Sequence, residues 1–156
     1  MKREAADPDP LAAWSTLVAV YQAVLHDVVQ ALGEQAGMDS GVFSALAYLE
    51  RAAPPHRMRM SELQGLLHPR YSQPGFSRLV QRMEADGLVD RRADPNDRRA
   101  AVLSTTRLGR RSYARANAVY SAAVREHFGR HLTANDGATI TRLLKQVAQR
   151  RGALTT

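Results

Sequence analysis

The chain has 156 residues, of which 44% are hydrophobic and 24% are charged, and it contains no cysteine. This composition is too apolar for a mainly disordered protein, and the lack of cysteine excludes disulfides, thiolate zinc sites and thiol redox sensing. The formal net charge is +7, and residues 70–115 carry eleven arginines against only five acids. A positive charge concentrated on one segment indicates a polyanionic partner.

The beginning of the chain, residues 1–9, is polar and lacks the apolar core of a signal peptide. We expect a mobile lead-in there. No uninterrupted apolar run reaches the roughly 18 residues of a membrane span. The sequence therefore predicts a cytoplasmic protein without a membrane partner.

Apolar residues at helical spacing predict one long helix over residues 10–35, with a broad apolar face. Gly37 marks its end. Either Asp39 or Ser40 is expected to cap a second helix, which runs to about Arg51.

The segment that follows carries the signals of one short strand and two further helices. The predicted elements are a breaker at residues 52–55, a strand at 57–60, a helix at 61–67, and a helix from about Ser72 to Asp86 that Gly87 stops.

A hairpin and two more helices complete the predicted order. The expected elements are a strand entered at Leu88 and Val89, a turn at 94–97, a partner strand at 101–103, a long helix capped by Thr105 or Thr106 that runs to about Phe128, and a last helix from Thr133.

This order predicts a mainly α protein with a small β-hairpin wing, in which residues 39–104 form a winged helix-turn-helix lobe. The terminal helices, at 10–36 and 105–156, carry more apolar surface than one small lobe covers. We therefore expect them to pair two subunits in a homodimer.

Three motifs follow one another through the predicted lobe. The first is Arg-Met-Ser-Glu-Leu at 59–63, and the second is Ser-Arg-Leu-Val-Gln-Arg-Met-Glu-Ala-Asp-Gly-Leu-Val at 77–89. The third is Asp-Pro-Asn-Asp-Arg-Arg at 94–99, with Gly109 further on. In order and spacing they resemble the MarR family of dimeric bacterial transcriptional regulators. The resemblance assigns them to the entry into the first helix of the helix-turn-helix, to the recognition helix, and to the wing with the start of the next helix.

The chain departs from the family pattern at the start of the recognition helix. About two extra residues lie between Leu63 and Ser72, with Pro69 among them, and Pro74 and Gly75 open the helix. Proline is tolerated in a first helical turn, so we expect the helix to form.

The residue types on the predicted recognition helix suit double-stranded DNA. Glutamine can read adenine, arginine can read guanine, and both can hold phosphate. Helical spacing places glutamines in one row and arginines in an adjacent row. The predicted contacts are Ser72, Gln73, Ser77, Arg78, Gln81 and Arg82 on this helix and Arg98 and Arg99 of the wing, which follow a tight turn that can enter a minor groove.

An alternative reading treats Arg78 and Arg82 as part of a solvated face, paired with the nearby acids Glu84, Asp86 and Asp90. For the wing, the resemblance implies that Asp97 helps to hold the arginines in position.

Family resemblance also implies an effector site between the dimer helices and the lobe. Trp14, His26 and Tyr48, with nearby arginines, are the predicted lining residues for a small anionic or aromatic molecule. A second possible site is the pair His127 and His131, whose spacing can present two imidazoles to zinc. Gly129 weakens the helix there and no third ligand is evident, so a basic helix end is the favoured reading, and no metal and no cofactor are predicted.

No phosphate loop, nucleophile elbow or paired-carboxylate motif occurs, so the sequence does not predict an enzyme. It predicts a dimeric, sequence-specific regulator of the repressor type that binds a pseudo-palindromic site and is relieved by an effector. Two other classes stay open, namely a non-specific architectural DNA-binding protein and a ligand-binding protein without operator specificity.

Overall fold

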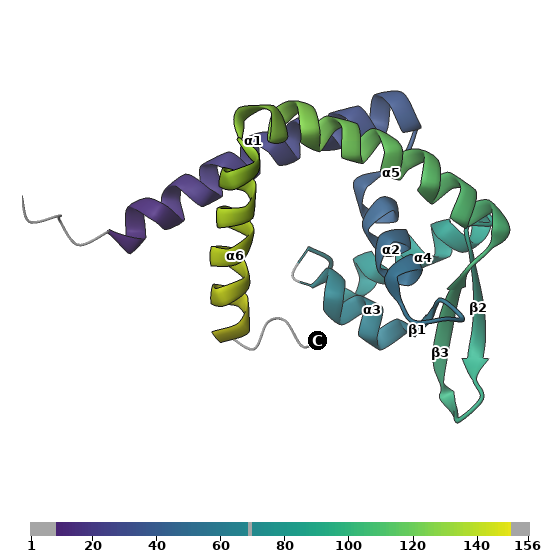
Figure 1. Ribbon diagram of the computed structural model, residues 1–156. Coiled ribbons are helices and arrows are strands. Elements are labelled where there is room, and N and C mark those ends of the chain that lie inside the picture. Colours follow the sequence, from purple (N-terminus) through teal and green to yellow (C-terminus); the bar gives the residue numbers. More distant parts are fainter. Residues whose placement is uncertain (1–8, 69, 151–156) are drawn as a thin grey trace, which may run out of the picture. The chain divides into compact units, whose positions relative to one another are not determined.

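The computed structural model describes residues 9–68 and 70–150, without the side chains of Arg98 and Arg99. It confirms a mainly helical fold with a small antiparallel sheet. Figure 1 shows the elements, which are α1 (Pro10–Ala36), α2 (Ser40–Arg51), β1 (Arg57–Arg59), α3 (Met60–Leu67), α4 (Gln73–Ala85), β2 (Val89–Asp94), β3 (Asp97–Thr105), α5 (Arg107–His127), the 3-10 turn η1 (Gly129–His131) and α6 (Ala134–Arg150).

The chain divides into two compact units. Among the described residues, the central unit lies within 29–121, and the terminal unit comprises 9–28 and 122–150. The division passes through α1 and α5, so the central unit includes the end of α1 and most of α5 in addition to the predicted winged lobe.

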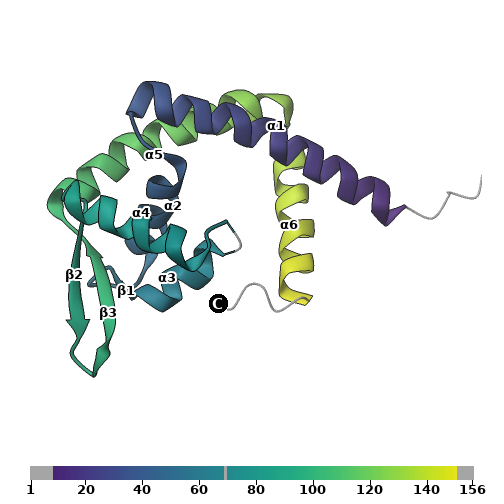
Figure 2. The same ribbon diagram turned by 180° about the vertical axis from the view of Figure 1, so that it is seen from behind.

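The sheet of the central unit has the strand order β1-β3-β2 and is antiparallel throughout. The strands β2 and β3 form the predicted hairpin and are joined by Pro95 and Asn96 (Figure 2). Met58 of β1 and Arg91 of β2 both lie opposite Leu103 of β3. The helix-turn-helix is thereby bound to the wing through backbone hydrogen bonds of β1.

The core of the central unit is formed where the helices meet the inner face of the sheet. One side of α4 is buried as its periodicity predicts. The largest side chains that are fully buried come from α1, α2, α3, α4 and β3, and they are Leu32, Leu46, Leu49, Leu63, Phe76, Val80, Met83 and Leu103.

Side-chain caps fix where the helices of the central unit begin. The carboxylate of Asp39, rather than Ser40, caps α2 by accepting hydrogen bonds from the backbone N–H groups of Gly41 and Val42. At α5 the cap is Thr106, whose hydroxyl accepts a 2.9 Å hydrogen bond from the N–H of Gly109. Its neighbour Thr105 is buried and instead donates to the carboxylate of Glu50.

In the terminal unit, α5 ends at His127 and is followed by η1, which the sequence did not predict. A capping box then starts α6: the Thr133 N–H donates to Oδ2 of Asp136, and the Asp136 N–H donates to the Thr133 hydroxyl. The Thr133 hydroxyl also donates to Oδ2 of Asp136, and the hydrogen bonds from this hydroxyl and from the Thr133 N–H lower the pKa of Asp136. The last helix therefore begins where the sequence places it.

The helix α1 is 27 residues long, and its most apolar window reaches a mean hydropathy of 1.2. By length and composition it is apolar enough to cross a membrane, contrary to the expectation that no segment is. Packed helices of soluble proteins pass the same test, and the C-terminal end of α1 contributes Val28, Ala31, Leu32 and Ala36 to buried positions.

Candidate nucleic-acid interface

The N-cap of α4 is Ser72, one of the residues predicted to contact DNA. The hydroxyl of Ser72 accepts a 3.3 Å hydrogen bond from the N–H of Gly75, and Pro74 lies in the first turn, where the lack of an N–H is tolerated. The departure from the family pattern therefore does not prevent the helix from forming. Ser72 itself remains exposed.

One side of α4 is exposed and polar and the other is buried, as is required of a helix that contacts DNA bases. Gln73, Arg78 and Gln81 are exposed and Ser77 is half-buried, whereas the opposite side is buried in the core. Because the buried side fixes the rotation of the helix, the exposed side chains share one polar surface. A surface of this kind can offer amide and guanidinium donors to base edges and phosphates.

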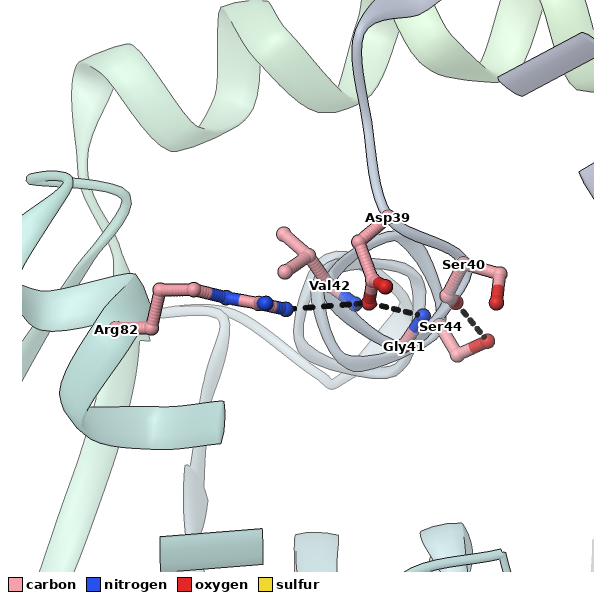
Figure 3. A network of polar contacts seen from close by, with 6 residues as sticks. All are labelled: Asp39, Ser40, Gly41, Val42, Ser44 and Arg82. Atoms are coloured by element: carbon pink, nitrogen blue, oxygen red, sulfur yellow. Dashed lines mark hydrogen bonds and ion pairs between the residues drawn. The ribbon is translucent and has the colours of Figure 1, made fainter. Parts of the chain in front are cut away.

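Arg82 is exposed as well, but it already has an ion-pair partner. Its Nη2 atom lies 3.2 Å from Oδ1 of Asp39, the residue that caps α2 (Figure 3). Of the acids offered by the alternative reading, Glu84, Asp86 and Asp90, none is this partner. Arg82 therefore ties the last turn of α4 to the first turn of α2, a relationship that sequence spacing did not show.

The two predicted wing arginines, Arg98 and Arg99, have side chains outside the described part of the structure. Their backbone lies in β3, directly after the turn that joins it to β2. Asp97, the predicted support of these arginines, begins β3 and has an exposed side chain. Its supporting role stays a prediction.

A different acid, Asp94, is buried at the wing, and the sequence reasoning missed it. Its Oδ1 accepts a 2.8 Å hydrogen bond from the N–H of Asn96, and its Oδ2 accepts a 2.7 Å hydrogen bond from Nε of Arg59. The hydrogen bond from Asn96 and the charge of Arg59 together lower the pKa of Asp94. An aspartate that opens the turn Asp-Pro-Asn-Asp was the available signal, because such side chains often bond to the backbone two residues on.

Of the predicted effector residues, Trp14 lies in a groove that the terminal unit forms by itself. Trp14 lines an apolar groove of about 880 Å³ within the terminal unit, formed by α1, α6 and the end of α5 with η1. Neither His26 nor Tyr48 lines that groove, and Tyr48 belongs to the central unit. Trp14 is 62% exposed, which leaves its indole available for contact.

The histidine pair does not share a continuous helix. His127 is the last residue of α5, and its Nδ1 lies 3.2 Å from Oδ2 of Asp27, whereas His131 ends η1. Within residues 9–68 and 70–150, no group of three or more His, Asp or Glu side chains is arranged to hold a metal ion.

Comparison with known proteins links the central unit to one family. Residues 36–100, from the end of α1 to the start of β3, match the model described as MarR family. This winged-helix segment is therefore similar to the MarR family. The MarR family is one of transcription regulators rather than of enzymes.

Solved MarR-family structures share the fold over most of the chain. AbsC, a MarR family transcriptional regulator from Streptomyces coelicolor, is 25% identical with a TM-score of 0.77, covering 98% of this chain and 100% of that chain. Sco3205 from the same organism, solved in complex with DNA, is 23% identical with a TM-score of 0.76 over 92% of this chain and 88% of its own.

A mutant MarR from E. coli, complexed with operator DNA, is 23% identical with a TM-score of 0.68, covering 89% of this chain and 98% of that chain. A comparison with curated protein sequences gave no significant match. The fold of this chain is thus similar to that of regulators solved with DNA, over 92% and 89% of its length.

Proposed function

We propose that this chain is a sequence-specific DNA-binding transcriptional regulator of the MarR family and of the repressor type, acting in the cytoplasm. The observation that carries the proposal is the polar surface of α4, where Gln73, Arg78 and Gln81 are exposed on a helix fixed by its buried side. Such a helix fits a major groove, and the wing that follows it can reach a flanking minor groove. The solved relatives bound to DNA support this reading.

A homodimer is part of the proposal, because the terminal unit leaves a large apolar surface uncovered. Leu11 is 72% exposed and Val147 is 55% exposed, and both come from helices at the ends of the chain. Soluble proteins rarely leave a large contiguous apolar surface open to water. A second copy with two-fold symmetry would cover it and would require a pseudo-palindromic site with half-site centres about one helical turn apart.

Relief by a small anionic or aromatic effector completes the proposal. The indole of Trp14 supports an aromatic ligand, which can stack on that ring; because the same groove carries Leu144 and Val147, we propose that this ligand binds where the subunits meet. Such a ligand lowers operator affinity only if it binds the DNA-incompetent dimer more tightly than the competent one. Screening aromatic carboxylates and phenols by Trp14 fluorescence, together with operator titrations, tests the coupling.

The deciding experiment is a titration against DNA from just upstream of the gene, with a scrambled duplex as competitor, over a range of salt concentrations. We expect preference for the upstream DNA, and Arg78→Ala should weaken binding and lower the salt slope by about one unit per contact and subunit. Arg142→Ala on α6 removes the same charge in the other unit and is the matched control.

Two outcomes would favour the rival classes. Equal binding to upstream and scrambled DNA would indicate a non-specific architectural protein. Ligand binding without any operator preference would indicate a ligand-binding protein that merely retains the wing.

A further inference from the structure

The tip of the wing lacks support from the third strand of the sheet. The strand β1 ends at Arg59, opposite Val102 of β3, so the hairpin beyond that point consists of β2 and β3 alone (Figure 2). Isolated two-stranded hairpins are marginally stable in water. The orientation of the tip therefore depends on contacts made by side chains.

The Arg59 side chain supplies such a contact. It leaves the end of β1 and donates from Nε to Oδ2 of Asp94, at a distance of 2.7 Å, while Oδ1 of the same carboxylate holds the N–H of Asn96 in the turn. The Asp94 side chain is 7% exposed and that of Arg59 is 50% exposed. A charge-assisted hydrogen bond to a shielded carboxylate belongs to the stronger class of hydrogen bonds.

The two residues of this contact belong to different parts of the winged helix-turn-helix. Arg59 directly precedes α3, the first helix of the helix-turn-helix, and occupies its N-cap position. Asp94 is the last residue of β2, immediately before the turn that leads to Arg98 and Arg99 in β3. One hydrogen bond thus joins the helix-turn-helix to the segment that carries the predicted minor-groove arginines.

We propose that Arg59 and Asp94 are positioning residues that hold the wing tip in the orientation in which its arginines reach DNA. This inference rests on the proposed DNA-binding function and assigns neither residue a DNA contact of its own. Without this contact the wing tip can adopt several orientations. DNA binding must then order the wing arginines, and the entropy cost of that ordering lowers the affinity for DNA.

The test is a set of titrations on an operator with A·T-rich flanks, because a narrow minor groove concentrates the potential that wing arginines sense. Arg59→Ala should weaken binding by about tenfold, the equivalent of one moderate contact. The salt slope should stay unchanged, because no phosphate contact is removed. Arg59→Lys keeps the charge and should recover part of the loss.

Asp94→Asn is an independent test, because the direction of the change in DNA affinity differs between a positioning role and a general electrostatic effect. Removing an acid raises the net charge and by itself tightens binding to DNA. Loss of positioning instead weakens it, and that is the expected result. Thermal melts of each variant, and of Arg142→Ala as the charge control, show whether the fold is retained.

A double-mutant cycle completes the design. In a chain that already carries Arg98→Ala and Arg99→Ala, Arg59→Ala should have no further effect on affinity. If it still weakens binding there, or lowers the salt slope by about one unit per subunit, Arg59 touches phosphate directly and the positioning role is wrong. Failure of the proposed function itself looks different, because the wild-type chain would then show no operator preference.

Discussion

The Nη2 atom of Arg82 and the Oδ1 atom of Asp39 lie 3.2 Å apart, and the same oxygen accepts hydrogen bonds from the N–H groups of Gly41 and Val42 (Figure 3). One carboxylate oxygen thus caps α2 and holds the last turn of α4. At the other end of α4, the hydroxyl of Tyr71 lies so close to Gly41 that a Cβ there would be 1.7 Å away. The first turn of α2 therefore contacts the last turn of α4 and also Tyr71, which comes just before the cap of α4.

The first prediction concerns whether Arg82 is available to DNA. Asp39→Asn keeps a good N-cap but removes the charge that competes with DNA phosphate for Arg82. The free energy of unfolding should change by less than about 1 kcal/mol, because both side chains of the pair are 51% exposed. Affinity for DNA should rise, and the salt slope with it, in anisotropy titrations. If affinity falls instead, and Arg82→Ala leaves the salt slope unchanged, Arg82 serves only to tie α4 to α2.

A second prediction concerns the close approach of α5 to the start of the wing. A Cβ added at Gly109 would lie 2.0 Å from the carbonyl oxygen of Leu88, which is backbone and cannot rotate away. Gly109→Ala should therefore lower the free energy of unfolding by about 1–3 kcal/mol, the usual range for overpacking. Denaturant unfolding measures this directly.

The matched control is Gly33→Ala in α1, because among the described residues nothing beyond the neighbouring backbone of the helix lies within 4 Å of a Cβ at that position. Alanine there should raise stability by about 0.5–1 kcal/mol through helix propensity. Equal effects of the two substitutions would show that the contact with Leu88 is unimportant.

The helices and the hairpin were predictable from sequence because their signals are local. Apolar periodicity, the stop at Gly87 and the turn before Asp97 each depend on residues a few positions apart, and the structure has elements at those places. The choice between Thr105 and Thr106 as the cap of α5 was not local, because it depends on the burial of Thr105 and its hydrogen bond to Glu50, which is distant in sequence.

The ion pairs at the candidate site were not predictable, because their partners are distant in sequence. The pairs Arg82–Asp39 and Arg59–Asp94 join different elements, and only the packed core sets those elements side by side. Sequence reasoning assigned Arg82 to DNA and looked for its partners among nearby acids. Nothing in the local sequence showed that Asp94 would be the buried acid of the wing.

The third prediction follows from the lowered pKa of Asp94. A carboxyl whose pKa is lower in the folded state stabilises the fold above its unfolded pKa of about 3.9, and that stabilisation is lost as pH falls through the folded pKa. The difference in unfolding free energy between the wild-type chain and Asp94→Asn should thus be constant near neutral pH and shrink below about pH 4. Urea unfolding at a series of pH values provides the measurement.

Asp136 also has a lowered pKa, so acid weakens the wild-type chain at two places. Measuring Asp94→Asn in the background of Asp136→Asn separates them. A difference that persists unchanged into acid would contradict the ionised contact between Asp94 and Arg59.

The fourth prediction tests the dimer through the apolar groove of the terminal unit. Leu144 of α6 lines that groove and is 43% exposed in the single chain. A buried charge without a partner is strongly unfavourable, so Leu144→Glu should disrupt a dimer formed through this surface. Lys145→Glu also introduces an acid, at the adjacent position outside the groove lining, and should leave assembly intact.

Sedimentation at micromolar concentration should give about twice the 17.2 kDa chain mass for the wild type and for Lys145→Glu, and the chain mass itself for Leu144→Glu. A wild-type chain that sediments as a monomer would remove the reason for a pseudo-palindromic site, and a Leu144→Glu dimer would place the interface on another surface.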